Sequence, residues 1–379
     1  MLYIHIPYCA KKCIYCDFYS AGNPDWKQYL TAVASELSMR IDEIRGGCLN
    51  SIYIGGGTPS LIPSVHFKSF FETVFSILKK EKISLGENME ITLEVNPEDV
   101  NLENIQIWKE SGINRISMGV QSLNDEELKI INRRHSSDKA LFALSILKQY
   151  FNNISVDIIY GLPGQTILSL KQTLDKLLEY KPNHVSAYAL TYEPGAPLSY
   201  LRKIGKIEEL DEDKYIEFSN LIDNKLKEEN YIRYEISNYA QDGFESRHNK
   251  GYWNGEDYLG LGPSACSYDG KAIRRSNPSD IKSYIKFFNK PILNSSFFYK
   301  EEILSAEELK EEDIFTSLRT AKGLDLERFE KKFGALEMRR LLHSSAKWIK
   351  SDDMKINDGC LKLTAKGIFI SDYIILSLI

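Results

Sequence analysis

The chain has 379 residues, of which 43% are hydrophobic and 27% are charged, proportions that are ordinary for a globular protein. This length suffices for one large domain and a smaller one. The formal net charge of −5 gives no general basic surface for nucleic acid or an anionic membrane, so we expect neither as a partner. We find no signal peptide and no transmembrane segment, which predicts a cytoplasmic protein with reduced thiols.

Apolar, strand-like runs alternate with amphipathic helical segments from the start of the chain. The predicted strands are Leu2–Ile6, Ser51–Ile54, Met89–Leu93, Arg115–Met118, Ile154–Ile159 and Val185–Leu190. The predicted helices between them are Trp26–Ile44, Val65–Lys79, Leu102–Ser111, Lys139–Tyr150 and Leu168–Glu179. Strands separated by helices of this length form βαβ units and a parallel sheet. A polar or glycine-rich motif follows each run, and a (β/α) barrel gathers its active site at these strand ends. We therefore predict an incomplete (β/α) barrel of six units.

The first motif follows the first predicted strand and has the spacing C-x3-C-x2-C, with Cys9, Cys13 and Cys16. Thiolates this close in sequence can bind one metal centre, either an iron–sulfur cluster or zinc. A structural zinc ion needs four ligands, and His5 is the only nearby candidate for the fourth. A four-iron cluster on three cysteines instead leaves one iron open to a small molecule. A partial zinc site and a redox pair of Cys13 and Cys16 are the alternatives. The remaining cysteines stand alone, and we expect them to be buried apolar residues: Cys48, Cys266 and Cys360.

Candidate ligand-binding residues follow the later strands. Gly55–Gly57 and Thr58 come directly after the second strand, and a glycine run lets the backbone approach a ligand and donate N–H groups to it. The next strand ends supply an acid, an amide, a guanidinium group and a second acid: Glu94, Gln121, Arg133 and Asp157. Such groups suit a zwitterionic amino acid that carries a ribose. Each of them taken alone is equally well a barrel-mouth residue with local hydrogen bonds.

The cysteine spacing resembles that of the radical S-adenosylmethionine (SAM) family. Together the motifs resemble the family of oxygen-independent coproporphyrinogen III oxidases, which includes a branch of haem chaperones. The resemblance implies a [4Fe–4S] cluster on Cys9, Cys13 and Cys16, whose open iron chelates SAM and whose electron cleaves SAM to methionine and a 5′-deoxyadenosyl radical. Thr58 stands where many radical SAM proteins have an acid, a departure that matches the porphyrin-related subfamily. The SAM contacts implied are Tyr3, Tyr15, Gly56, Gly57, Thr58, Glu94, Gln121, Arg133, Asp157, Ala189 and Cys266.

A second group of candidate residues lies in the segment H-N-x-x-Y-W, with His248, Tyr252 and Trp253. An imidazole can ligate haem iron, and the two aromatic rings can pack on the macrocycle. Arg274 and Arg275 follow, and guanidinium groups suit haem propionates. The residues alone favour a hydrogen-bonded loop histidine beside core aromatics. The resemblance favours haem binding, because this segment is associated with the haem-chaperone branch.

The end of the chain has a different pattern from the first 290 residues, whose last long helix we expect at Asp211–Glu229. Residues 357–359 read Asn-Asp-Gly, a hairpin signal, and Thr364 is expected to cap a final helix. Further helices are predicted at Ala306–Thr320, Leu326–Phe333 and Leu336–Ile349. We therefore predict two domains: residues 1–290, the partial barrel with its extension, and residues 291–379, a smaller α+β, winged-helix-like domain. It mixes glutamate with lysine, so we expect it to cover or dock at the barrel mouth and not to bind DNA.

The resemblance leaves two functions open. In one, the protein is a haem chaperone that binds haem, passes it to apo-haemoproteins and uses a reducing partner for its cluster. In the other, it is an enzyme, an oxygen-independent coproporphyrinogen III oxidase that decarboxylates two propionates to vinyl groups. The oxidases typically have a further cysteine where this chain has Phe18, and an N-terminal extension, whereas this chain starts two residues before Tyr3. These departures and the H-N-x-x-Y-W segment favour the chaperone.

Overall fold

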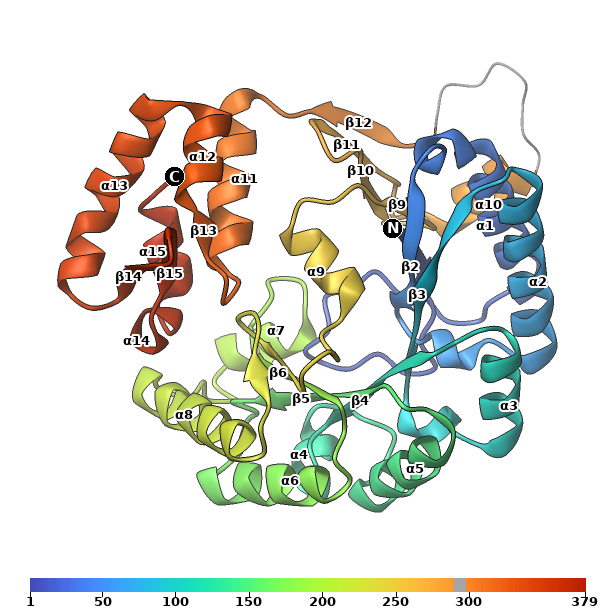
Figure 1. Ribbon diagram of the computed structural model, residues 1–379. Coiled ribbons are helices and arrows are strands. Elements are labelled where there is room, and N and C mark those ends of the chain that lie inside the picture. Colours follow the sequence, from blue (N-terminus) through green and yellow to red (C-terminus); the bar gives the residue numbers. More distant parts are fainter. Residues whose placement is uncertain (290–297) are drawn as a thin grey trace.

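Six parallel strands form the framework of the chain in a computed structural model that describes residues 1–289 and 298–379 (Figure 1). Consecutive strands are neighbours in the sheet. The strands curve into an open arc with helices on its outer side, so the predicted incomplete (β/α) barrel is confirmed. The six strands are β1 (Leu2–Ile6), β2 (Cys48–Gly56), β3 (Ser84–Val95), β4 (Arg115–Gln121), β5 (Ile154–Tyr160) and β6 (His184–Ala189).

Three short strands extend this sheet at its edges. β9 (Leu259–Leu261) lies parallel to β1, whereas β8 (Asn238–Ala240) lies antiparallel to β6 and pairs with β7 (Ile232–Arg233). The order in the sheet is β7-β8-β6-β5-β4-β3-β2-β1-β9, so β7 and β9 are its two ends and the barrel stays open. The sequence does not predict these strands because two or three residues are too few to display the alternation of a strand.

Helices cover the outer face of the arc (Figure 1). They are α1 (Trp26–Met39), α2 (Ser64–Lys80), α3 (Leu102–Glu110), α5 (Ser137–Tyr150), α6 (Ile167–Glu179) and α8 (Glu212–Glu228), with the shorter α4 (Asp125–Ile130) and α7 (Pro197–Lys203) after β4 and β6. No helix within the described ranges is both long enough and apolar enough to cross a membrane.

The prediction of one helix over Trp26–Ile44 is wrong. The helix α1 ends at Met39, and a separate 3-10 turn follows at Ile41–Ile44. Arg40 at the break donates hydrogen bonds to Glu36 on α1 (2.9 Å) and to Glu43 in the turn (2.8 Å). These bonds stabilise the change of direction, and periodicity in the sequence does not reveal them.

Side chains alternate sharply between the two faces of the arc. Residues under the helices are apolar and fully buried, including Ile4, Ile54, Leu93, Ile116 and Val156. The alternate residues face the inside of the arc and are mostly polar or aromatic: Tyr3, His5, Ser51, Tyr53, Glu90, Glu94, Ser117, Asp157, Ser186 and Tyr188. A closed (β/α)8 barrel fills its interior with branched apolar side chains. The interior of this barrel is instead suited to a polar ligand.

The segment after β8 adds two helices and a second sheet. The helix α9 (Arg247–Trp253) lies against β2 in the opening of the arc (Figure 1), and α10 (Ile281–Asn289) packs on α1. The second sheet is antiparallel, with the strands β10 (Cys266–Tyr268), β11 (Ile273–Ser276) and β12 (Lys300–Ile303). β12 therefore belongs to a sheet that begins before residue 290.

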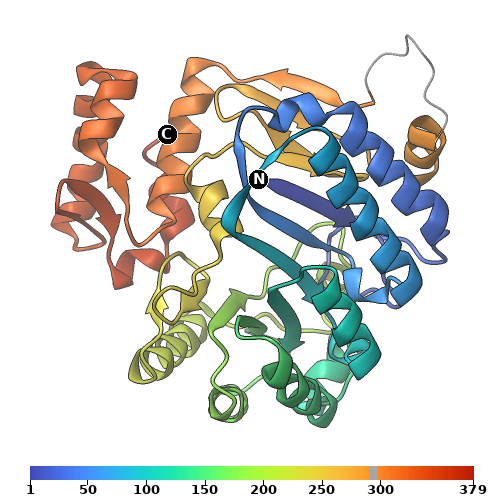
Figure 2. The ribbon, with the colours of Figure 1, turned by 45° about the vertical axis from the view of Figure 1, so that its right-hand side comes forward.

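The C-terminal part has its own apolar core and lies to one side of the barrel (Figure 2). It combines a three-stranded antiparallel sheet with helices, which confirms the predicted smaller α+β domain. Its elements are α11 (Ala306–Leu318), β13 (Leu324–Asp325), α12 (Leu326–Phe333), α13 (Ala335–Lys350), β14 (Met354–Asn357), β15 (Cys360–Leu363), α14 (Ala365–Ile368) and α15 (Ser371–Leu376).

Two local features of this domain match the sequence patterns. Asp358 and Gly359 connect β14 and β15 with φ of 51° and 73°, the left-handed pair that a tight hairpin turn requires. Thr364 caps α14 by accepting a hydrogen bond from Gly367 N, although the predicted single last helix is two short helices, α14 and α15. The predicted domain boundary after residue 290 lies outside the described residues.

Candidate functional site

The predicted ligand-binding residues gather at the C-terminal ends of the parallel strands. The cysteine loop follows β1, Gly56 ends β2, Glu94 lies near the end of β3, and Gln121 ends β4. The sixth strand ends at Ala189, which is exposed. Because parallel strands have their C-terminal ends at the same side of the sheet, these residues form one rim around the polar interior.

Two of the three cysteine sulfur atoms in the loop already have hydrogen-bond donors. Thr58 Oγ1 lies 3.6 Å from Cys9 Sγ, and Arg133 Nη1 lies 3.6 Å from Cys13 Sγ. Cys16 N donates to Cys13 O (3.3 Å), so the last two cysteines share a turn. A hydroxyl and a guanidinium group directed at sulfur stabilise thiolates, the form in which cysteine binds a metal. The donor set therefore fits an iron–sulfur cluster.

His5 has a hydrogen-bond partner at one ring nitrogen, while the other, the buried Nε2, has none among the described residues. Its Nδ1 lies 2.9 Å from the hydroxyl of Tyr3, and its ring is buried in the barrel interior. Within residues 1–289 and 298–379, no three Cys, His, Asp or Glu side chains converge on a single-ion position. A four-iron cluster binds each thiolate through a different iron and needs no such convergence.

Glu94 is held at the mouth by two donors. The Tyr53 hydroxyl lies 2.8 Å from one carboxylate oxygen, and Gly56 N lies 3.0 Å from the other. Burial raises the pKa of Glu94 to about 7, and the nearby Asp157 also raises it, while the Tyr53 hydrogen bond lowers it. A carboxylate in this position is ready to accept a hydrogen bond from a bound ligand.

The glycine run permits a close approach of two backbone segments. A Cβ atom on Gly57 would lie 2.6 Å from Tyr8 O and 2.9 Å from Ile6 O, so only glycine fits at this position. Gly57 N donates to Ile6 O (2.7 Å), which joins the glycine run to the start of the cysteine loop. The run thus fixes the loop relative to β2.

Arg133 links the cysteine loop to the ends of β3 and β4. Its Nη2 donates to Gly119 O (2.5 Å) and Asn96 Oδ1 (2.9 Å), and its buried Nε has no partner among the described residues. Gln121 beside it has a φ of +65°, in the left-handed region that residues other than glycine rarely adopt. Backbone strain of this kind concentrates at binding sites.

Asp157 faces the interior from β5. Its carboxylate accepts hydrogen bonds from Ser117 (3.1 Å) and Ser155 (3.4 Å), and burial raises its pKa. Tyr188 also faces the interior but was not predicted as a site residue, and its side chain is 42% exposed although it lies in the strand β6. Its period-2 spacing from Ser186 is the sequence signal that could have identified it.

Tyr15 lies beside Cys13 and near Arg133, and it packs against the apolar cluster that includes Ile131 and Leu198. Cys266 is exposed at the start of β10, and Cys48 is exposed at the start of β2, so the expectation that both are buried is wrong. Both lie at strand ends, away from a core, whereas Cys360 is buried as expected.

The structure separates the aromatic residues of the H-N-x-x-Y-W segment. His248 is buried on α9, with Nδ1 2.8 Å from Ser51 Oγ and Nε2 3.0 Å from the Tyr252 hydroxyl. Trp253 is half-buried, and no ring contact joins it to His248 or Tyr252 among the aromatic pairs of the described residues. Both imidazole nitrogens of His248 therefore already have hydrogen-bond partners.

Arg274 and Arg275 are also paired within the protein. Arg274 forms an ion pair with Glu312 on α11. Arg275 contacts Glu43 (3.2 Å) and Glu301 (2.9 Å). These ion pairs use the guanidinium groups that were expected to suit propionates.

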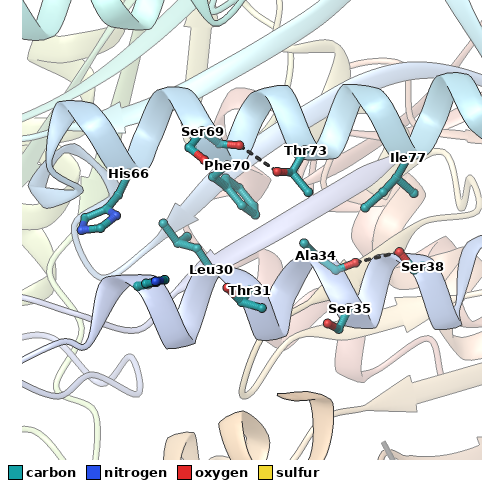
Figure 3. Close-up of a pocket in the computed structure, with 11 residues that line it drawn as sticks. Leu30, Thr31, Ala34, Ser35, Ser38, His66, Ser69, Phe70, Thr73 and Ile77 are labelled. Carbon is teal, nitrogen blue, oxygen red and sulfur yellow. Dashed lines mark hydrogen bonds between the residues drawn. The ribbon is translucent and has the colours of Figure 1, made fainter. Parts of the chain in front are cut away.

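A surface groove lies away from this rim. It has a volume of about 440 Å³ and lies on the outer side of the barrel between α1 and α2 (Figure 3). Leu30, Ser35, Phe70 and Thr73 are among the residues that line it, and none of the predicted site residues does. The groove is therefore separate from the candidate site.

Residues 3–177 match the radical SAM superfamily, and residues 304–370 match the HemN C-terminal domain. Among curated proteins, the chain is 36% identical to heme chaperone HemW of Buchnera aphidicola from Schizaphis graminum, over 79% of each chain. It is 33% identical to heme chaperone HemW of Bacillus subtilis, over 88% of this chain and 86% of the relative. The chain belongs to the HemW family of radical SAM proteins. Family membership implies a [4Fe–4S] cluster and SAM as cofactors.

Other HemW relatives match the full length of the chain. The chain is 30% identical to heme chaperone HemW of Mycobacterium tuberculosis over 100% of this chain and 94% of the relative. Among solved structures, coproporphyrinogen III oxidase (HemN) of Escherichia coli is similar over 100% of this chain and 89% of that one, with a TM-score of 0.82 and 23% identity. The latter likeness establishes a fold shared by this chain and the oxidase.

Replacement of Cys9, Cys13 or Cys16 by Ala is expected to abolish the absorbance of the reconstituted cluster and its reduced-state EPR signal. We expect each of these thiolates to bind a separate iron, and the other three cysteines lie elsewhere in the fold. Cys48→Ala and Cys360→Ala are the matched controls and should keep both signals. Loss of the cluster in either control would contradict the assignment.

The affinity for SAM is expected to depend on the protonation of Glu94. A raised pKa means that this carboxyl group is protonated below about pH 7, and the protonated form accepts a hydrogen bond from SAM less well. The ratio of the SAM affinity of the wild type to that of Glu94→Gln should grow about tenfold as the pH rises from about 6 to about 8. Calorimetry at several pH values measures this ratio, and a constant ratio would contradict the role of Glu94.

Proposed function

We propose that this chain is a haem chaperone, which binds haem and delivers it to apo-haemoproteins. The observation that carries the proposal is the similarity to several curated heme chaperones HemW at 30–37% identity over most of the chain. We also propose that the protein is cytoplasmic and that a partner reduces its cluster.

In this proposal, SAM binds in the polar interior next to the cluster. When bound, the cluster supplies an electron and an open iron for SAM. The residues of this chain supply the rest: Thr58 and Arg133 donate to the cysteine sulfur atoms, while Glu94 and Asp157 offer buried carboxylates. The remaining proposed contacts are Tyr3, Tyr15, Gly56, Gly57, Gln121, Ala189 and Cys266.

The alternative is the oxidase, and the fold does not separate the two because HemN has the same architecture. The cluster loop favours the chaperone. The oxidases typically have a further cysteine at the position of Phe18, which here is an aromatic residue and is 64% exposed. A phenyl ring cannot replace the thiolate of that cysteine.

The haem contacts at His248, Tyr252 and Trp253 stay a prediction. In the structure, ligation of iron by His248 would require one of its two hydrogen bonds, to Ser51 or to Tyr252, to break. Burial also lowers the pKa of His248 to about 3, so the ring is neutral and shielded from solvent. The haem-chaperone proposal does not depend on this residue as the ligand.

Haem titration and a decarboxylation assay on the same anaerobically reconstituted protein test the function. We expect a Soret band that saturates with haem, transfer of that haem to apomyoglobin as a probe acceptor, and no conversion of coproporphyrinogen III. The Cys16→Ala protein serves as the control that lacks the cluster. Decarboxylation at an appreciable rate without saturable haem binding would assign the chain to the oxidases.

A further inference from the structure

His248 lies at the lowest of three layers inside the barrel. In the register of β2 and β3, Ser51 pairs with Glu90, and Tyr53 pairs with Thr92 one layer higher. Glu94 follows Thr92 by two residues and so lies in the next layer, toward the mouth. His248 contacts Ser51 through Nδ1, and its backbone N donates to Glu90 (3.2 Å). It therefore belongs to the floor of the interior.

Glu90 anchors the helix that carries His248. Its two carboxylate oxygens accept hydrogen bonds from the backbone N of His248 (3.2 Å) and Arg247 (3.2 Å). The Ser246 hydroxyl donates to the same carboxylate (3.4 Å) and caps α9. Because Glu90 belongs to β3, α9 is fixed to the strand that carries Glu94.

The imidazole of His248 supports the ring of Tyr53. The two rings are stacked, with centroids 5.1 Å apart and planes at 27°. Tyr252 packs edge-on against the imidazole, with centroids 4.8 Å apart. A neutral imidazole has one donor and one acceptor, and the hydroxyls of Ser51 and Tyr252 satisfy both. The orientation of the ring is thereby determined.

Tyr53 carries this constraint to the mouth of the barrel. Its ring rests on His248, and its hydroxyl donates to Glu94 (2.8 Å). Displacement of the imidazole would free the Tyr53 ring to tilt and would lengthen this hydrogen bond. The geometry of Glu94 at the SAM end therefore depends on His248 at the floor, although the two side chains do not touch.

We propose that His248 is a positioning residue for the SAM site, which acts on Glu94 through the stacked ring of Tyr53. This inference rests on the SAM-binding part of the proposed function and not on haem transfer. It explains why a histidine with two hydroxyl partners lies under the barrel mouth.

The test is a double-mutant cycle in SAM affinity, measured by calorimetry on the anaerobically reconstituted protein. Tyr53→Phe removes the hydrogen bond to Glu94 and should weaken SAM binding about tenfold. His248→Ala should weaken it by a similar factor. If His248 acts through Tyr53, the double variant should be no weaker than either single variant, whereas independent roles would multiply to about a hundredfold.

Two further variants separate positioning from folding. His248→Gln retains an amide that can donate to one hydroxyl and accept from the other, so it should recover part of the affinity that His248→Ala loses. Ser51→Ala keeps the imidazole and removes one of its hydrogen bonds. If His248→Ala loses the cluster, Ser51→Ala tests the positioning role instead. Ser51→Ala should weaken SAM binding in the wild-type background and should have no further effect in the Tyr53→Phe background. Lys250→Ala, at an exposed position of the same helix, is the matched control.

The results of these experiments test the positioning role of His248 separately from the haem-chaperone proposal. A His248→Ala protein that binds SAM like the wild type, or a double variant with multiplied losses, would overturn the positioning role and leave the chaperone proposal intact. Loss of the Soret band in His248→Ala at unchanged SAM affinity would also overturn it, in favour of haem ligation. A wild-type protein with its cluster but without SAM binding would refute both the SAM site and this inference.

Discussion

The alternation of side chains along six short strands is the constraint on which the site depends. Apolar residues such as Ile54 and Leu93 point to the helices and are fully buried. Their neighbours Tyr53 and Glu94 therefore have to point inward, where they meet across the sheet. The hydrophobic packing that stabilises the barrel thus also builds its polar interior. A shift of one residue in the register of a strand would exchange the two faces and destroy both.

Burial of the inward carboxylates gives the interior its chemical character. Glu94 and Asp157 both have raised pKa values, because burial disfavours their charged forms. A ligand that supplies hydrogen-bond donors offsets this cost. Arg133 at the rim is instead a hydrogen-bond donor, and it donates to the sulfur atom of Cys13. The rim thus carries a donor directed at a cysteine sulfur atom, and the interior carries buried carboxylates that can accept hydrogen bonds.

Much of this arrangement could be predicted from the sequence. The strand positions, the cysteine loop and the residues after each strand follow from local patterns, and these patterns place Glu94 and Gln121 at one rim. Tyr53 could not be recognised as a functional neighbour, because its importance arises from contacts with Glu94 and with His248, which is distant in sequence. The short edge strand β9 could not be predicted either, because three residues are too few to show an alternation of apolar and polar side chains.

The contacts of the H-N-x-x-Y-W segment could not be predicted from its neighbours in the sequence. The residues alone favour a hydrogen-bonded histidine beside core aromatics, and the family resemblance favours one surface around a haem iron. The helix α9 instead directs Tyr252 toward His248, four residues earlier, and no such contact joins Trp253 to them. The buried partners Ser51 and Glu90 come from strands at the start of the chain. No spacing within the segment reveals that its histidine forms the floor of another site.

The most direct test of the account is an EPR measurement on the reduced cluster with SAM that carries 17O in its carboxylate. The account places SAM in the polar interior beside the cluster held by Cys9, Cys13 and Cys16, with one iron open to it. We expect addition of SAM to shift the signal, and the 17O label to broaden it or to produce a hyperfine coupling. A signal that is identical with and without SAM, while calorimetry shows SAM to be bound, would contradict the placement of SAM at the cluster.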